Sequence, residues 1–172
     1  MYVVLSAPSI ASLKSKTNVS QGSAVAISQS LALSNCHVVK GGNVILIVKG
    51  DNIFPTKLKF ADQNTDRCFL EIREGRLSPI SGIKPFTSLE VGEKVYTMGS
   101  PSGLVNTLGE GIVSGLRQED NINYVQTTAP ISPGSSGGGL FDAKGNLVGI
   151  TTFLLKNTQN LNFAISADAF WE

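Results

Sequence analysis

Apolar and polar positions alternate in short runs along most of the chain, and turn-forming Gly, Asn, Asp and Pro residues separate these runs. Alternation over about four to eight residues is typical of β-strands with one buried face. Almost no window carries apolar residues at the i, i+3, i+4, i+7 spacing of an amphipathic helix. The pattern therefore predicts an all-β protein.

We predict two sets of six strands, separated by the turn-rich segment "SPISGIKPF". The first set comprises Tyr2–Ser6, Ser23–Ser28, Leu31–Asn35, Val44–Val48, Thr56–Phe60 and Cys68–Ile72. The second set comprises Lys94–Met98, Leu108–Leu116, Tyr124–Thr128, Gly139–Asp142, Leu147–Phe153 and Asn162–Ile165. Two sets of this size are typical of a pair of six-stranded antiparallel barrels.

These strands define one domain over residues 1–172, with the first barrel in residues 1–80 and the second in residues 86–166. A chain of 172 residues can bury a core without disulfides. Its last residues, 167–172, resemble the start of a helix that the chain ends before completing. Ser166 or Asp168 could cap this helix.

The charge of the chain is nearly balanced, with 14 Lys and Arg residues against 13 Asp and Glu residues. No basic run could follow a phosphate backbone, so we expect no nucleic-acid partner. No apolar stretch approaches the roughly 20 residues of a membrane span. The opening "MYVVLSAPSIASLK" lacks the basic start and long apolar centre of a signal peptide, so any export signal lies outside this chain.

The stretch "PGSSGGG", residues 133–139, can be understood in two ways. Gly/Ser tracts usually form flexible spacers because they bury little apolar surface. Here, however, both flanks are predicted strands with tight turns, so ordered chain holds the tract at both ends. A rigid loop that presents a reactive serine is the second interpretation.

Serine becomes a good nucleophile only when a base accepts its proton, and the usual base is a histidine oriented by a carboxylate. The chain has one histidine, His37, which we expect at the end of a strand that leads into a Gly-Gly turn. If an imidazole activates Ser136, it must therefore be that of His37. Each residue taken alone is more often structural than catalytic, and only their joint arrangement favours chemistry.

The order of the candidate residues distinguishes between protease architectures. The pattern Gly134-x-Ser136-x-Gly138 matches the nucleophile elbow of α/β-hydrolases, but that fold needs a histidine after the serine. A subtilisin-like order needs an acid before the histidine, and residues 1–36 contain neither Asp nor Glu. The remaining order is His, acid, Ser, which is that of the chymotrypsin-like double barrel and agrees with the strand pattern.

The acid must lie between His37 and Ser136. Asp66 is the best candidate because "NTDRCFLEI" places it at the entrance to an alternating strand, where a carboxylate can be held beneath an imidazole. Asp62 and Asp51 are weaker candidates because their surroundings are more polar and typical of turns.

The segments "LSNCHVV", "NTDRCFLEI" and "QTTAPISPGSSGGGLFDAKGNLVGITT" together resemble the trypsin-like serine proteases of the HtrA (DegP-type) group. The resemblance extends from Gly22 to Ser166 and implies a single protease domain with its active site in the cleft between the barrels. It implies a serine endopeptidase that works through an acyl-enzyme on Ser136, with His37 as general base and Asp66 as the orienting acid.

The resemblance also implies an oxyanion hole made by the backbone N–H groups of Gly134 and Ser136. Gly134 fits this role because turning its N–H inward favours backbone angles that are closed to residues with a Cβ. Digestive relatives carry an aspartate before the nucleophile, which pairs with a freed amino terminus. Here the residue is the uncharged Ser135, so no such activating ion pair can form.

The two cysteines flank the candidate triad, since Cys36 adjoins His37 and Cys68 lies two residues after Asp66. They could form a disulfide, remain two buried thiols or supply a catalytic thiol. The catalytic thiol is least favoured because neighbouring residues on a strand project in opposite directions. Residue types alone do not decide between a disulfide and buried thiols.

The resemblance implies that the substrate backbone binds as an added strand along Thr152, Phe153 and Leu154. It places the primary pocket among Pro130, Ile131, Ser132, Asn162 and Ala164. None of these residues carries a carboxylate, so a Lys or Arg side chain would be buried without a partner. We therefore expect cleavage after small or medium uncharged residues.

We expect no metal and no cofactor. One histidine and two cysteines cannot complete a zinc shell without carboxylates at unusual spacing. The "GSPSG" segment, residues 99–103, lacks the lysine of a phosphate-binding P-loop.

The expected partners are polypeptide substrates. The resemblance also allows a homo-oligomer, an additional C-terminal domain outside this chain and an extracytoplasmic location. Two further interpretations stay open. One is an inactive or latent protease fold that binds peptides, and the other is a fragment of a larger polypeptide whose binding domain directs the activity.

Overall fold

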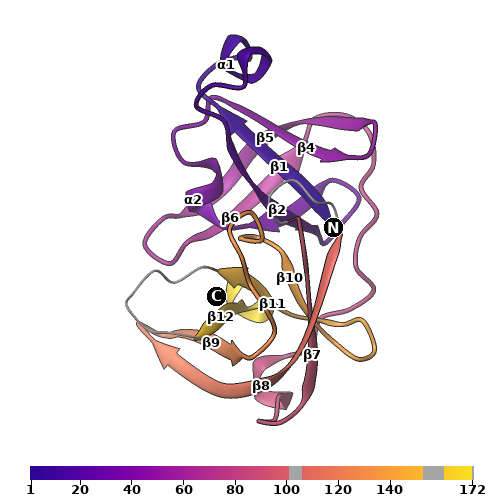
Figure 1. Cartoon of the computed structure of the whole chain (residues 1–172), viewed down its shortest axis with the longest axis vertical. Helices are drawn as coiled ribbons and strands as arrows, with labels where there is room; N and C mark the ends of the chain where they lie inside the picture. Colours follow the sequence, from indigo (N-terminus) through magenta and orange to yellow (C-terminus); the bar gives the residue numbers. More distant parts are fainter. Residues whose placement is uncertain (101–105, 153–160, 172) are drawn as a thin grey trace.

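The computed structural model describes residues 1–100, 106–152 and 161–171, and these residues form two closed antiparallel barrels of six strands each (Figure 1). The strands of the first barrel are β1 (Tyr2–Ala7), β2 (Ser20–Ala26), β3 (Leu31–Ser34), β4 (Val44–Lys49), β5 (Asn52–Asp62) and β6 (Arg67–Ile72). Those of the second are β7 (Lys94–Gly99), β8 (Thr107–Glu119), β9 (Ile122–Thr127), β10 (Gly139–Asp142), β11 (Leu147–Thr152) and β12 (Asn162–Ser166). The prediction of an all-β double barrel is confirmed.

Each barrel is closed because the strands at the two ends of its sheet also pair with each other, β1 with β4 and β10 with β7. In the first barrel β1 pairs with both β2 and β4, and in the second β10 pairs with both β11 and β7. Closure leaves no free sheet edge, which is how barrels avoid unpaired backbone groups. The long strands β5 and β8 each carry an irregularity in their pairing, and such bulges let a strand bend around a barrel.

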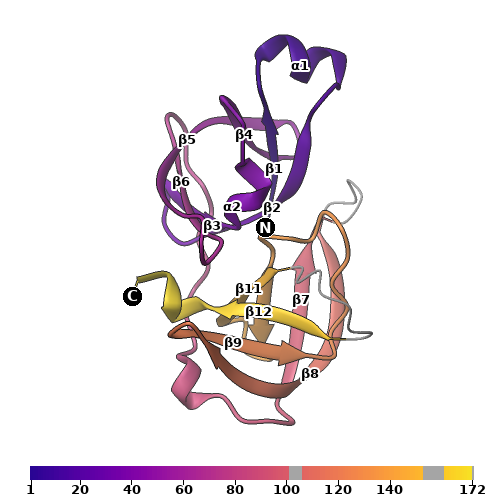
Figure 2. The same ribbon diagram turned by 90° about the vertical axis from the view of Figure 1, so that its left-hand side faces the viewer.

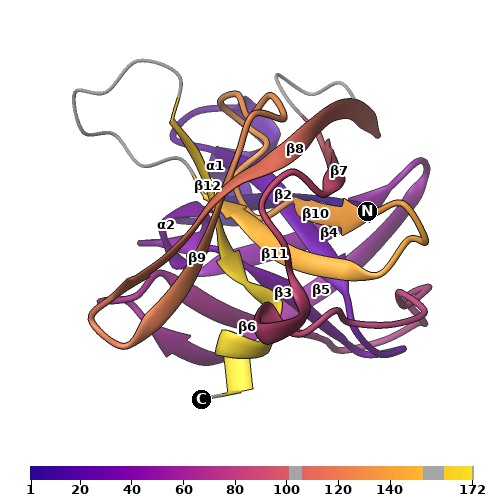
Figure 3. The same ribbon diagram turned by 90° about the horizontal axis from the view of Figure 1, so that it is seen from below.

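The two barrels share an apolar core in addition to their own interiors. This shared cluster joins Val25, Leu33 and Phe69 of the first barrel to Ile150 and Ile165 of the second. The turned view shows the barrels stacked, with the C-terminal segment following β12 at the level where the two barrels meet (Figure 2). Seen from below, the strands of the second barrel lie in front of those of the first (Figure 3). Burial of a common apolar surface holds the barrels in a fixed relation.

The structure adds short helical elements that the alternating pattern does not reveal. They are α1 (Ile10–Ser15), α2 (Cys36–Val39) and the 3-10 helices η1 (Phe86–Ser88) and η3 (Ala167–Trp171). Ser9 caps the start of helix α1, because its hydroxyl accepts a hydrogen bond from the Ser12 N–H, and Lys16 follows the end of the helix in a left-handed conformation with φ of 56°. Serine is a favoured cap, but six residues are too few to show the i, i+3, i+4, i+7 spacing of an amphipathic helix.

One local expectation is corrected. His37 lies in the helical turn α2 and not at the end of a strand. The C-terminal segment forms the 3-10 helix η3, and the Asp168 carboxylate accepts a hydrogen bond from the Phe86 N–H at 3.0 Å. Asp168 therefore ties the linker between the barrels to the chain end. Among the described residues, no helix is both long and apolar enough to cross a membrane.

Candidate active site

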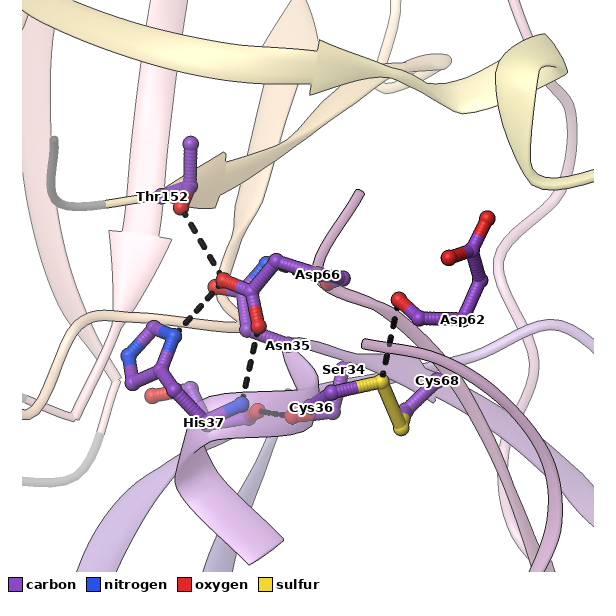
Figure 4. Close-up of polar contacts among 9 residues, drawn as sticks. Ser34, Asn35, Cys36, His37, Asp62, Asp66, Cys68 and Thr152 are labelled. Atoms are coloured by element: carbon purple, nitrogen blue, oxygen red, sulfur yellow. Dashed lines mark hydrogen bonds and ion pairs between the residues drawn. A yellow bond between two sulfur atoms is a disulfide. The ribbon is translucent and has the colours of Figure 1, made fainter. Parts of the chain in front are cut away.

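The turn α2 and the start of β6 bring His37 and Asp66 together. The Nδ1 atom of His37 lies 2.6 Å from Oδ2 of Asp66, and the His37 N–H donates to Oδ1 of the same carboxylate at 2.8 Å (Figure 4). The first N–H groups of a helical turn have no partner within it. Asn35, which precedes the turn, makes no capping bond with its side chain, and Asp66 supplies the acceptor instead.

The backbone of Asp66 is held against the same turn. Its carbonyl accepts hydrogen bonds from the Cys36 N–H and from Nδ2 of Asn35, both at 3.3 Å. Asp66 itself is in the left-handed region with φ of 58°, which Asp tolerates better than most residues. Four hydrogen bonds thus orient this acid toward His37.

A hydroxyl from the second barrel also reaches the acid. Thr152, the last residue of β11, donates from Oγ1 to Oδ2 of Asp66 at 3.4 Å and approaches from the side opposite to α2 (Figure 4). The carboxylate therefore accepts contacts from both barrels. Because Asp66 occupies Nδ1 of His37, the Nε2 atom of the imidazole is left to accept a proton.

Cys36 and Cys68 form a disulfide, with their Cα atoms 5.0 Å apart. This settles the alternative between thiols and a disulfide, and it rules out a catalytic thiol. The earlier reason against the thiol, opposite projection along a strand, does not apply because Cys36 lies in α2. The disulfide fastens the segment that carries His37 to the strand that follows Asp66.

The serine loop, residues 133–139, is rigid by its hydrogen bonding and is not a spacer. The Gly134 carbonyl accepts from the Ser23 hydroxyl at 3.0 Å, and the Ser136 carbonyl accepts from the Ser23 N–H at 2.8 Å. The Ser135 carbonyl accepts from the Gly138 N–H at 2.8 Å and from the Thr151 hydroxyl at 2.9 Å. These bonds fix three successive carbonyls of the loop.

Two N–H groups of the serine loop remain available. Within the described ranges, no hydrogen bond occupies the N–H of Gly134 or that of Ser136. Since the carbonyl and the N–H of a trans peptide point in opposite directions, anchoring the Ser135 carbonyl inward turns the Ser136 N–H outward. Gly134 has φ of 88°, a conformation that glycine adopts without strain. N–H groups without an acceptor in the protein can donate to a bound anion.

Ser136 lies beside the turn that carries His37. A Cβ added to Gly22 would lie 2.5 Å from Val38 and 3.0 Å from the Ser136 carbonyl oxygen, so both residues pack against Gly22. Thr151 anchors the serine loop, and its neighbour Thr152 contacts Asp66. No hydrogen bond joins the imidazole to the Ser136 hydroxyl in the part of the chain that the structure describes.

The three candidate residues differ in how much of their surface solvent reaches. The His37 side chain is 47% exposed and that of Asp66 is 27% exposed, whereas Ser136 is buried with 6% exposure. The two alternative acids lie elsewhere. Asp62 binds Arg67 at 3.1 Å, and Asp51 is exposed in the turn between β4 and β5. Of the three candidate acids, only Asp66 contacts His37.

The residues expected to contact substrate are only partly described. Phe153 and Leu154 lie outside the described residues. Ile131 is buried, and Nδ2 of Asn162 donates to the Ala129 carbonyl at 2.9 Å, which ties β12 to the segment before the serine loop. Pro130 and Ser132 line a cavity of about 70 Å³ that also touches Ser135.

Sequence reasoning did not find the polar residues that support the site. These are Asn35, Ser23 and Thr151, together with the contact of Thr152 to the acid, since Thr152 was expected only to bind substrate. Single Ser, Thr and Asn residues on strands carry no pattern that distinguishes them. As for metals, residues 1–100, 106–152 and 161–171 contain no cluster of three or more His, Cys, Asp or Glu side chains that could hold an ion.

The sequence of this chain is similar to those of known serine proteases. Residues 22–150 match the family model of the trypsin-like peptidase domain. Serine endoprotease DegS of Haemophilus influenzae is 34% identical over 160 residues, which cover 86% of this chain and 47% of DegS. The mitochondrial serine protease HTRA2 of Drosophila willistoni is 36% identical over 162 residues, which cover 87% of this chain and 36% of HTRA2.

The fold is also similar to that of a solved HtrA-type protease structure. The HtrA-type protease AlgW with tripeptide superposes with a TM-score of 0.84 at 27% identity, and the match covers 99% of this chain and 57% of the AlgW chain. The present chain therefore spans less than half of DegS and of HTRA2.

Proposed function

Because this chain belongs to the trypsin-like peptidase domain family, we propose that it is a serine endopeptidase that forms an acyl-enzyme on Ser136. The observation that carries the proposal is the His37–Asp66 contact of 2.6 Å, set beside a serine loop with two unoccupied N–H groups in the described structure. The similarity to HtrA-type proteases supports polypeptides as the class of substrate.

In the proposed mechanism Nε2 of His37 accepts the proton of the Ser136 hydroxyl while its oxygen attacks the peptide carbonyl. Asp66 keeps the proton of Nδ1 in place and stabilises the imidazolium that forms. His37 then gives its proton to the departing amine, which leaves an ester on Ser136. Water, deprotonated by His37, hydrolyses this ester and regenerates the serine.

The N–H groups of Gly134 and Ser136 would stabilise the oxygen that becomes negatively charged in each tetrahedral intermediate. Removal of one such donor in other enzymes costs about 3–4 kcal/mol of transition-state stabilisation. The hydrogen bonds to the Gly134 and Ser135 carbonyls support this role because they orient the loop before substrate binds. Such preorganisation avoids a reorganisation cost during the reaction.

Labelling by a fluorophosphonate, which reacts with activated serines, tests the proposal. We expect labelling of the wild-type chain, none of Ser136→Ala and strongly reduced labelling of His37→Ala. Ser81→Ala, at an exposed position in the linker between the barrels, should be labelled like wild type. An unlabelled wild-type chain that remains folded would contradict the proposal.

The alternative function is an inactive or latent protease fold that binds peptides. It is favoured by one observation, the lack of a hydrogen bond between His37 and Ser136 among the described residues. Catalytic hydrogen bonds often tighten only when substrate binds, so this geometry is compatible with activity. Peptide binding without labelling would support the alternative, and turnover of a peptide substrate would exclude it.

A further inference from the structure

Ser23 connects the first barrel to the serine loop through its side chain as well as its backbone. It lies in β2, is completely buried, and its hydroxyl donates to the Gly134 carbonyl at 3.0 Å. The same hydroxyl oxygen accepts from the Ser100 N–H at 3.0 Å. Its N–H donates to the Ser136 carbonyl at 2.8 Å, and its carbonyl accepts from the Ser34 hydroxyl at 2.8 Å. Every polar group of Ser23 is thus used.

The contact with Gly134 fixes the orientation of one peptide group of the serine loop. The Gly134–Ser135 peptide is held at both ends, because its carbonyl accepts from Ser23 and its N–H donates to the Ser132 carbonyl at 2.9 Å. A planar peptide held at both ends cannot rotate without breaking a bond. The two proposed oxyanion donors, the N–H groups of Gly134 and Ser136, lie on the peptides immediately before and after it.

Other residues do not duplicate this restraint. Thr151 holds the next peptide through the Ser135 carbonyl, whereas the Gly134 carbonyl has the Ser23 hydroxyl as its one donor among the described residues. Loss of the hydroxyl would leave that carbonyl and the buried Ser100 N–H unsatisfied. Both groups could then recover a hydrogen bond by moving toward water. Such a shift of Gly134 would turn its N–H away from the proposed position of the substrate carbonyl.

We propose that Ser23 is a positioning residue for the oxyanion hole, which sets the direction of the Gly134 and Ser136 N–H groups from the opposite barrel. The inference rests on the proposed function. It extends that function because it assigns part of the catalytic geometry to a strand of the first barrel that contributes no group to the reaction itself.

The expected signature is a loss of kcat with little change in KM. Oxyanion donors act on charge that develops in the transition state, so a misdirected donor weakens transition-state binding and leaves substrate binding unchanged. Removal of a donor costs about a hundredfold to a thousandfold in kcat. Because Ser23→Ala would displace the donors without deleting them, we expect kcat to fall by about tenfold to a hundredfold and KM to stay within about twofold.

The experiment compares wild type, Ser23→Ala and Ser6→Ala with an N-blocked tripeptide p-nitroanilide that ends in valine. Ser6 is the matched control because it is also a buried serine in the first barrel, and it lies in β1 with no hydrogen bond to the serine loop among the described residues. Ser6→Ala should retain the wild-type kcat. A kcat for Ser23→Ala within about twofold of wild type would overturn the inference.

A merely structural role would lower the unfolding midpoint and the active fraction but not the kcat per active site, so active sites are titrated with the fluorophosphonate. If Ser23→Ala does not fold, Ser23→Cys replaces it, because a thiol is of similar size but a weaker donor. We then expect an intermediate kcat at unchanged KM, and a wild-type kcat would overturn the inference. A wild-type chain without any turnover would instead contradict the proposed endopeptidase function.

Discussion

Cys36 and Cys68 are joined by a disulfide, and each lies within two residues of a member of the proposed triad. Cys36 directly precedes His37, and Cys68 follows Asp66 by two positions. The bridge thus links the two segments whose contact orients the imidazole. Both cysteines are buried, so the bond lies behind the site, away from the solvent that reaches His37.

Removal of this bridge should lower stability and activity together. The disulfide joins residues 32 positions apart, and a loop of this size is expected to contribute about 2–4 kcal/mol to the free energy of unfolding. We expect Cys36→Ala/Cys68→Ala to unfold at a correspondingly lower urea concentration. Its kcat should also be reduced, because the helical turn that carries His37 becomes more mobile.

The control for this prediction is a dithiol reductant. Reduction should lower the urea midpoint of wild type toward that of the double variant, whereas the midpoint of the double variant should not change. Equal urea midpoints for oxidised wild type and the double variant would show that the bond does not stabilise the fold.

The strands could be predicted because alternation and turn residues are local signals. The helical turn α2 could not, since the four residues Cys36–Val39 are too few to show the i, i+3, i+4, i+7 spacing that reveals a helix. The triad candidates followed from the single histidine and the order of residue types, which are properties of the chain alone. The disulfide depends on the pairing of Ser34 with Cys68 between β3 and β6, a register that the sequence leaves open.

The supporting hydroxyls were missed for a related reason. Ser23, Thr151 and Thr152 are ordinary strand residues, and their partners lie in distant parts of the sequence. Ser23 and Gly134, for example, are 111 positions apart. Such contacts arise from the way in which the two barrels pack, and they become visible only when both barrels are placed together.

Thr152→Val should reduce kcat by removing a donor to Asp66. The hydroxyl lies 3.4 Å from Oδ2, a long hydrogen bond, so its loss should cost about 1 kcal/mol and lower kcat about fivefold. Steady-state kinetics with the p-nitroanilide substrate measures this. Thr152→Ser keeps the hydroxyl and should restore most of the activity.

Thr56→Val is the matched control for Thr152→Val. Thr56 is buried in the first barrel, and its hydroxyl donates to the Phe54 carbonyl at 2.7 Å, away from the site. We expect its kcat to equal that of wild type. If Thr152→Val and Thr56→Val have the same kcat, the Thr152 hydroxyl does not support the acid.

Arg67→Met should destabilise the protein strongly. Arg67 is buried, donates to the Ala169 carbonyl of η3, and binds Oδ2 of Asp62 at 3.1 Å and the Thr65 hydroxyl at 2.8 Å. It therefore links the loop before β6 to the C-terminal helix of the other barrel. Arg67 is buried but the Asp62 side chain is 27% exposed, so the main loss is that of the hydrogen bonds to the Ala169 carbonyl and the Thr65 hydroxyl, about 2–3 kcal/mol.

Urea unfolding tests the Arg67 prediction against Arg117→Met, whose guanidinium contacts Gln126 at the surface. The exposed control should change the free energy of unfolding by about 0.5 kcal/mol or less. Because Arg67 adjoins Asp66, the variant should also lose kcat. A similar midpoint for both variants would mean that the contacts of Arg67 do not join the barrels energetically.

Substrate preference should follow the lack of a carboxylate in the expected primary pocket. The residues expected to form it are Pro130, Ile131, Ser132, Asn162 and Ala164, and none of them can pair with a buried cation. We expect kcat/KM for a valine p-nitroanilide to exceed that for its lysine counterpart by about a hundredfold, since an unpaired buried charge costs several kcal/mol. Predominant cleavage of a peptide library after Lys or Arg would contradict this.

Stability should fall in acid in part because of Asp142, the last residue of β10, which accepts hydrogen bonds from the turn that leads to β11. Burial tends to raise the pKa of this carboxyl, but hydrogen bonds from the Asn146 side chain and from the N–H groups of Asn146 and Lys144 outweigh it, and the pKa is lowered from 3.8. Oδ1 accepts the two N–H groups at 2.9 Å, and Oδ2 accepts Nδ2 of Asn146 at 3.0 Å.

A carboxyl with a lower pKa in the folded state binds fewer protons there than in the unfolded state, so its contribution to stability is present above the unfolded pKa and is lost as pH falls through the folded value. Asp142→Asn removes this dependence. The Asn oxygen can still accept the two N–H groups, but an NH2 donor replaces Oδ2, which accepted Nδ2 of Asn146. We expect the variant to be about 1–2 kcal/mol less stable than wild type at neutral pH.

This difference should shrink as the pH falls below 3.8, because wild type then loses the charge that the variant lacks. Urea midpoints of both proteins measured from pH 7 to pH 2.5 provide the test. A difference that stays constant over this range would show that the turn is stabilised by hydrogen bonding that does not depend on the charge of Asp142.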